Sequence, residues 1–136
     1  MGVIKYLVGL LLFSLLACSG PIDVGPGLAK VSHQFSEAMR WRDYLGAAHF
    51  LQQDLRSTFL EQFQGDEDLY IVESRIININ LNKADGTAEA DYLLEYYRLP
   101  SSRVKKWRWL QQWQLCREKI TQPGIWQIIN APPPLL

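Results

Sequence analysis

The sequence predicts an α+β domain in which N-terminal helices pack on a curved four-stranded antiparallel sheet. In the first half of the chain, apolar residues recur at steps of three and four, as on one buried helix face. From Leu69 onward, apolar and polar residues alternate, which is typical of strands that bury one face. The length of 136 residues leaves room for one compact domain.

Two helices are expected. The first spans residues 32–53, with Ser32 as its N-cap, and Gly46 either weakens its interior or lets another element approach closely. The second is shorter, spans residues 55–63, and is followed by Gly65, a residue type that often ends helices. The apolar positions that define the first helix are Phe35, Ala38, Met39, Tyr44, Leu45, Ala48 and Leu51.

Four strands follow. They are expected over residues 69–82, 88–99, 104–119 and 123–130, and Asp85–Gly86 forms the turn between the first two. The faces expected to be buried are Ile77, Ile79 and Leu81 on the first strand, Ala88, Ala90, Tyr92, Leu94 and Tyr96 on the second, and Trp107, Trp109, Trp113 and Leu115 on the third.

Composition narrows the function classes. The formal net charge is zero, so a strongly basic nucleic-acid surface is not expected. The two histidines, His33 and His49, lack a nearby ligand cluster for zinc, and we expect neither a metal nor a cofactor. The acidic residues 65–68 offer oxygen ligands for calcium, but a solvated turn is the preferred interpretation.

The first 17 residues are typical of a secretory signal peptide. Lys5 is followed by an apolar run, Tyr6 to Ala17, that only Gly9 and Ser14 interrupt. This run is too short for a transmembrane helix, which needs about 20 residues. We therefore expect an exported protein.

Leu15, Leu16, Ala17 and Cys18 together resemble the lipobox of bacterial lipoproteins. The resemblance implies that the peptide is cut before Cys18, and that Cys18 carries diacylglycerol and an acylated amino terminus. Ser19, rather than an aspartate, favours the outer membrane by the sorting rule of enteric bacteria. The alternative is an ordinary signal peptide with an incidental cysteine.

The mature chain divides by composition. Residues 18–30 contain the lipidated cysteine and a tether rich in glycine and proline, residues 31–131 form the domain, and residues 132–136 form a proline-rich tail that leaves it. Once Cys18 is acylated, Cys116 has no partner for an intrachain disulfide. We expect Cys116 to be a buried, inert thiol.

Two N-terminal helices, long curved strands and a final strand with Gly124, Trp126 and Ile128 resemble the NTF2-like family over residues 31–130. That family usually has a third helix before the strands, which this chain has little room for. The resemblance implies a concave sheet around a helix, with a pocket lined by aromatic residues. Self-association into a homodimer through the open sheet face is compatible with the same family.

The candidate ligand-binding residues are aromatic: Tyr44, Tyr92, Trp107, Trp109 and Trp113. A row of tryptophans at strand spacing is also what a hydrophobic core contains. The basic and aromatic run 103–109 suits an anionic lipid surface, but equally a strand with solvated lysines and core tryptophans.

The leading hypothesis is a non-enzymatic envelope lipoprotein that binds a small apolar ligand or a protein partner. The alternative is an enzyme of the isomerase or dehydratase type in the same cavity, with Tyr44, His49, Asp91 and Tyr92 as candidate acids and bases. Asp91 and Tyr92 project from opposite faces of a regular strand, and no residue matches the family's catalytic pattern.

Overall fold

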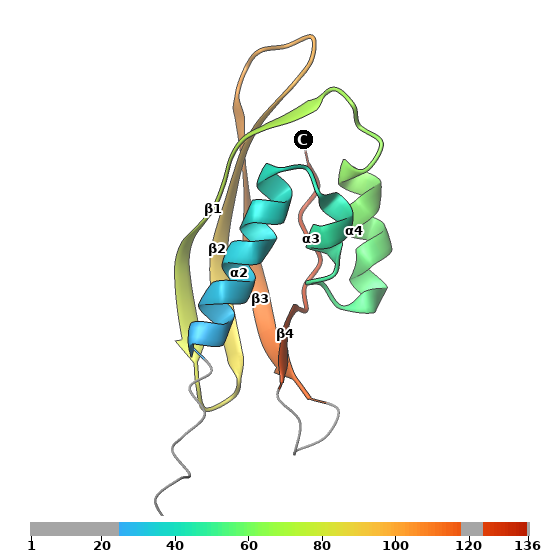
Figure 1. Ribbon diagram of the computed structural model, residues 1–136. Coiled ribbons are helices and arrows are strands. Elements are labelled where there is room, and N and C mark those ends of the chain that lie inside the picture. Colours follow the sequence, from blue (N-terminus) through green and yellow to red (C-terminus); the bar gives the residue numbers. More distant parts are fainter. Residues whose placement is uncertain (1–24, 118–123, 136) are drawn as a thin grey trace, which may run out of the picture.

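The computed structural model describes residues 25–117 and 124–135. Its elements come in the predicted order, helices first and sheet second (Figure 1). The strands form one antiparallel sheet in the order β1-β2-β3-β4. The predicted α+β fold class is therefore confirmed. None of the described helices is long and apolar enough to cross a membrane. The elements are α2 (Gly25–Arg40), α3 (Tyr44–Ala48), a 3-10 helix (Gln53–Leu55), α4 (Arg56–Phe63), β1 (Leu69–Asn82), β2 (Thr87–Arg98), β3 (Lys105–Cys116) and β4 (Ile125–Ile128).

Helix α2 begins earlier than predicted. It starts at Gly25, so residues 25–30, which were assigned to the tether, are helical. Ser32 is not an N-cap but a buried residue inside the helix, and its hydroxyl donates to the carbonyl of Ala29 at 3.1 Å. The glycine and proline content of residues 25–27 favoured a tether. The sequence did not indicate that Leu28 is buried, which the structure shows.

The predicted first helix is also broken in the middle. Arg42 has a positive φ of 58°, which ends the right-handed helix. Asp43 then starts α3 by accepting a hydrogen bond from the N–H of Gly46 at 2.9 Å. A Cβ at position 46 would collide with the Asp43 carboxylate, so the cap itself requires this glycine.

Strand β1 contains two bulges that change which side chains face the core. Its register against β2 shifts once between Ile71 and Glu73 and again between Ile76 and Asn78. Ile77 is therefore exposed, and the prediction that it shares the buried face with Ile79 is wrong. Ile76 takes its place in the partly buried set that packs on the core.

Strands β2 and β3 follow the predicted alternation. Tyr92 and Trp109 lie opposite each other and are fully buried. The charged residues lie on the other face, where Arg108 approaches Asp91 at 3.7 Å. The basic and aromatic run thus has core tryptophans and outward-facing lysines. Cys116, at the end of β3, is half-buried rather than buried.

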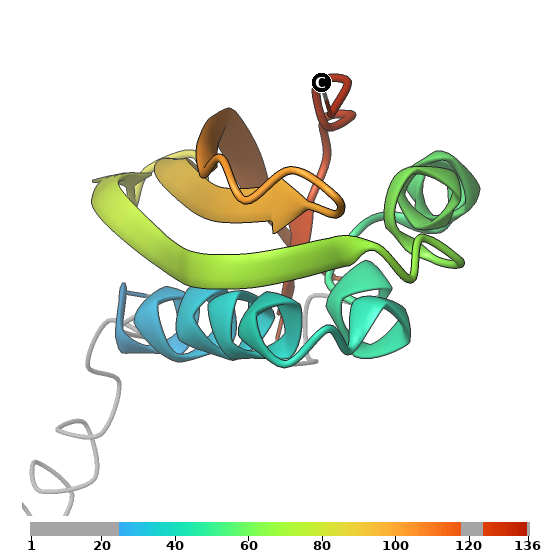
Figure 2. The same ribbon diagram turned by 90° about the horizontal axis from the view of Figure 1, so that it is seen from above.

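The core is a cluster of aromatic rings between the sheet and the helices. Figure 2 shows α2 lying against β1 and α4 set to the side of the curved sheet. Phe35 of α2 reaches Tyr92 and Trp109, with ring centroids 5.3 Å and 6.0 Å apart. Phe63 of α4 packs on Trp107 at 5.5 Å. The helices are thus held on the sheet by large side chains.

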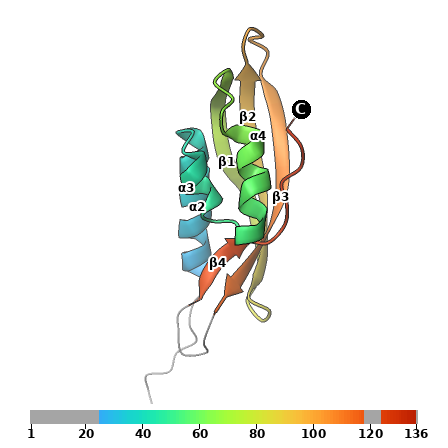
Figure 3. The same ribbon diagram turned by 90° about the vertical axis from the view of Figure 1, so that its right-hand side faces the viewer.

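The C-terminal tail does not leave the domain as predicted. After β4 it turns back beside β3 and reaches α4 (Figure 3), where the N–H of Leu135 donates to Gln62 at 2.8 Å. The side chain of Asn130 bonds to the backbone at the edge of β3, as a neighbouring strand would. It accepts from the N–H of Gln112 at 2.7 Å and donates to the carbonyl of Leu110 at 2.8 Å.

We expect Asn130→Ala to lower the free energy of unfolding by about 1–2 kcal/mol, since two backbone groups at the edge of β3 lose their partner. Urea unfolding of the purified protein measures this loss. Gln114→Ala, an exposed position on the same strand, is the matched control and should change stability by less than about 0.5 kcal/mol. Equal effects of the two variants would contradict the structural role of Asn130.

Candidate functional site

The five predicted ligand-binding residues lie together, but mostly inside the core. Tyr92, Trp109 and Trp113 are at most 1% exposed, Trp107 is buried, and Tyr44 is half-buried and stacks on Phe63 at 5.3 Å. Tyr44 borders one surface hollow and Trp113 borders another. The concave face of the sheet is therefore packed with side chains, not hollow.

Of the candidate acids and bases, Tyr44 and Tyr92 both belong to the aromatic core, whereas His49 and Asp91 do not. Asp91 lies on the outer face of β2, whereas Tyr92 points into the core, as predicted for a regular strand. His49 ends α3, and its N–H donates to the carbonyl of Ala47. Among the described residues, no group of three or more His, Cys, Asp or Glu side chains is placed to hold a metal ion.

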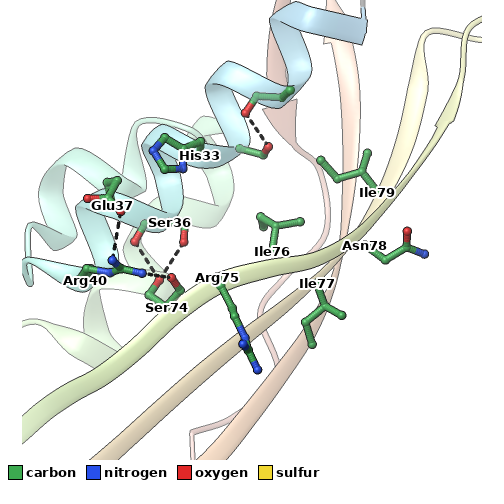
Figure 4. A pocket seen from close by; sticks show the side chains of 12 residues that line it. His33, Ser36, Glu37, Arg40, Ser74, Arg75, Ile76, Ile77, Asn78 and Ile79 are labelled. Atoms are coloured by element: carbon green, nitrogen blue, oxygen red, sulfur yellow. Dashed lines mark hydrogen bonds and ion pairs between the residues drawn. The ribbon is translucent and has the colours of Figure 1, made fainter.

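A surface groove runs between α2 and β1 and has a volume of about 540 Å³. One wall is a stripe of α2 that repeats every three or four residues, and the other is six consecutive residues of β1. Figure 4 shows Ile76 pointing into this groove from β1 and Arg75 pointing away from α2. The lining residues are Ala29, Ser32, His33, Ser36, Glu37, Arg40, Ser74, Arg75, Ile76, Ile77, Asn78 and Ile79.

Three buried hydroxyl groups form a hydrogen-bonded cluster at one end of the groove. The hydroxyl of Ser74 donates to the carbonyl of Ser36 at 2.8 Å. Because Ser74 has a single hydroxyl proton, its oxygen accepts from Tyr92, 2.7 Å away, and from the hydroxyl of Ser36, 3.2 Å away. This cluster ties α2 to both β1 and β2.

An ion-pair network closes the same end of the groove. Arg40 donates to Glu73 at 2.7 Å and to the backbone carbonyl of Ser74 at 3.0 Å, and it lies 3.6 Å from Glu37. Both acidic side chains near the groove are thus engaged with Arg40. His33 and Arg75 supply basic side chains along its length.

Burial raises the pKa of the Tyr92 hydroxyl above its usual value of 10.0, opposed by the hydrogen bond with Ser74 and by the charge of Arg40. The unfolded chain therefore releases this proton above pH 10, while the folded protein keeps it. Stability should fall as pH rises through that range. Burial acts in the same direction on Tyr44 and Tyr96.

Between pH 9 and pH 11, we expect the free energy of unfolding of the wild-type protein to fall by about 1 kcal/mol more than that of Tyr92→Phe. The reason is that the variant lacks the tyrosine hydroxyl proton. Urea midpoints at both pH values measure the difference. Tyr70→Phe, at an exposed tyrosine, serves as the control and should behave as wild type. Parallel losses in wild type and Tyr92→Phe would contradict the raised pKa.

The sequence interpretation missed the groove. Its best signal is the run of small and polar residues at helical spacing along α2, from Ala29 through Ser32 and Ser36 to Arg40. Ser74 carried no such signal, because the bulge before it decides which face of β1 it occupies. The hydrogen bond between Ser74, which lines the groove, and Tyr92, which lies in the aromatic core, links the two.

Together, the fold and the groove describe a small α+β domain with a packed interior and a surface cleft beside an edge strand. No family model matches the chain, and no curated protein matches it. Among solved structures, the TraE protein in complex with 2-(2-furyl)isonicotinic acid is similar, with 11% sequence identity and a TM-score of 0.51. The match covers 82% of this chain and 95% of that chain, and it shows a shared fold.

Proposed function

We propose that this chain is a non-enzymatic envelope lipoprotein whose domain binds a protein partner in the groove between α2 and β1. The observation that carries the proposal is the contrast between the packed aromatic interior and the open groove. A binding site on the concave face would require removal of the Phe35, Tyr92 and Trp109 rings from one another. The groove instead offers polar and apolar groups to a partner without rearrangement of the core.

Placing a photoreactive amino acid at position 29 of the full chain, in its native envelope, tests this proposal. Ala29 is exposed and lines the groove, whereas Gln34 is exposed on another face of the same helix. We expect a discrete crosslinked partner from position 29 and not from position 34. No crosslink, or the same crosslinks from both positions, would contradict binding in the groove.

The proposal places the domain on the periplasmic side of a membrane, more specifically the outer membrane, through acylated Cys18. Cys18 lies outside the described residues. Several acyl chains, each contributing about 0.8 kcal/mol per buried methylene, would make the attachment essentially permanent. Mass spectrometry of the mature protein should find an amino terminus at Cys18 carrying lipid, and an unmodified chain beginning at Met1 would contradict it.

A small ligand is the second candidate for the groove. Its support is the TraE complex, in which a domain of similar fold binds a small heteroaromatic carboxylic acid. Titrating the purified full chain with 2-(2-furyl)isonicotinic acid and following backbone amide signals by NMR tests this directly. Saturable shifts confined to residues such as His33 and Ile76 would favour a small ligand, and unchanged spectra would count against this compound class.

A further inference from the structure

The edge of β1 that faces away from β2 is closed at its beginning. At Leu69, the backbone carbonyl accepts a hydrogen bond from Arg42 at 3.1 Å. At Ser74, the carbonyl accepts from Arg40 at 3.0 Å, and the N–H donates to the Glu73 carboxylate at 3.1 Å. Side chains therefore stand where the backbone of a neighbouring strand would bond.

The register then fixes which backbone groups face the groove. Ser74 lies opposite Leu94, but its own backbone groups bond to side chains, so this pair exchanges no ladder hydrogen bonds. Such pairs alternate with bonded pairs along an antiparallel ladder. Ile76 lies opposite Tyr92, and Ile79, after the bulge, lies opposite Ala90, at steps of two along β2 from Leu94. Both pairs are therefore also of the type that exchanges no ladder hydrogen bonds. The N–H and C=O groups of Ile76 and Ile79 therefore point away from β2.

Opposite these backbone groups, α2 presents small side chains. Ala29 and Ser32 line the same groove as Ile76 and Ile79, whereas the long cationic side chain of Arg40 is bonded to the backbone at Ser74. From Ile76 to Leu81 the strand spans about 17 Å at roughly 3.3 Å per residue. The groove therefore combines a strand edge that no other described strand pairs with and a helix wall that leaves space beside it.

We propose that the occupant of this groove is a short extended segment of a partner protein, which adds to β1 as a fifth strand and bonds to the backbone of Ile76 and Ile79. This inference rests on the proposed function. A second copy of the chain fits less well, because Arg40 and Glu73 block the edge at Ser74 and the bulge at Ile77 bends it. A single short strand pairing is also too small on its own to bury the roughly 800 Å² per partner of a typical stable dimer.

Charge and side-chain size define the class of segment. Alternate side chains of an added strand point to opposite faces of the sheet. On the outer face they would lie beside the exposed Arg75, which Figure 4 shows pointing away from α2. An acidic side chain is complementary there. On the inner face they would lie between Ile76 and α2, where small or apolar side chains fit.

Selection of linear eight-residue peptides from a phage-displayed library against the full chain tests the inference. We expect selected peptides that alternate apolar and acidic positions. Binding should slow hydrogen exchange at the amides of Ile76 and Ile79 at least tenfold. Ala29→Trp should weaken binding at least tenfold by filling the groove, whereas Gln34→Trp, on another face of α2, should leave it unchanged.

Several outcomes would overturn strand addition. These are a selection that yields no peptide, peptides that bind Ala29→Trp as well as wild type, and bound peptides that leave exchange at Ile76 and Ile79 unchanged. Concentration-dependent slowing of the same amides without peptide would assign the edge to a second copy instead. The exchange data stand even if Ala29→Trp fails to fold. A position-29 crosslink without slowed exchange would overturn strand addition while retaining the proposed function.

Discussion

Replacing Phe35 with alanine should lower the free energy of unfolding by about 3–5 kcal/mol, a large share of the roughly 5–15 kcal/mol that stabilises a typical domain. Phe35 is fully buried, and its ring lies within 6.5 Å of five other aromatic rings. Truncation leaves a cavity that rigid rings fill poorly. Phe35→Leu keeps most of the volume and should cost about 1–2 kcal/mol.

Urea unfolding followed by circular dichroism measures both variants. Trp41→Ala is the matched control, because Trp41 is 77% exposed and its removal should change stability by less than about 0.5 kcal/mol. A loss of under 1 kcal/mol for Phe35→Ala would mean that the interior tolerates a void. That result would favour the aromatic-lined pocket that the NTF2-like resemblance implies, and would contradict the packed core.

The aromatic residues illustrate what sequence can and cannot predict. Their alternation along β2 and β3 was predicted, because those two strands are regular and one face is buried. Whether Trp109 lines a pocket or fills a core was open, because both environments use the same residue types. The answer depends on Phe35 and Phe59, which reach Trp109 from helices distant in the sequence.

The groove was beyond prediction for a different reason. A bulge changes which face of the sheet each later side chain in the strand occupies. Neither bulge in β1 is marked by a glycine or proline. Ser74 therefore could not be assigned to the core face, nor Ile76 to the groove. The break in the first helix depends on a positive φ at Arg42, a residue type that gives no warning of it. Non-local packing decides each of these features.

Ser74→Ala is expected to cost about 2–3 kcal/mol, although it deletes a single oxygen atom. Ser74 is 1% exposed, and its hydroxyl is the shared partner of Tyr92 and Ser36. Without it, the buried hydroxyl of Tyr92 loses its acceptor. Ser36 can turn toward its own helix backbone, so it loses less. Tyr92→Phe should cost only about 1 kcal/mol, because Ser74 still donates to the carbonyl of Ser36.

The double variant Ser74→Ala/Tyr92→Phe separates this hydrogen-bond effect from simple loss of packing. It removes both partners, so no unpaired hydroxyl of Tyr92 remains, and its cost should be smaller than the sum of the single variants by about 1–2 kcal/mol. Urea unfolding at pH 7 measures all three. Additive losses would mean that the contact of 2.7 Å between the two oxygens, which joins β1 to β2, contributes nothing to stability.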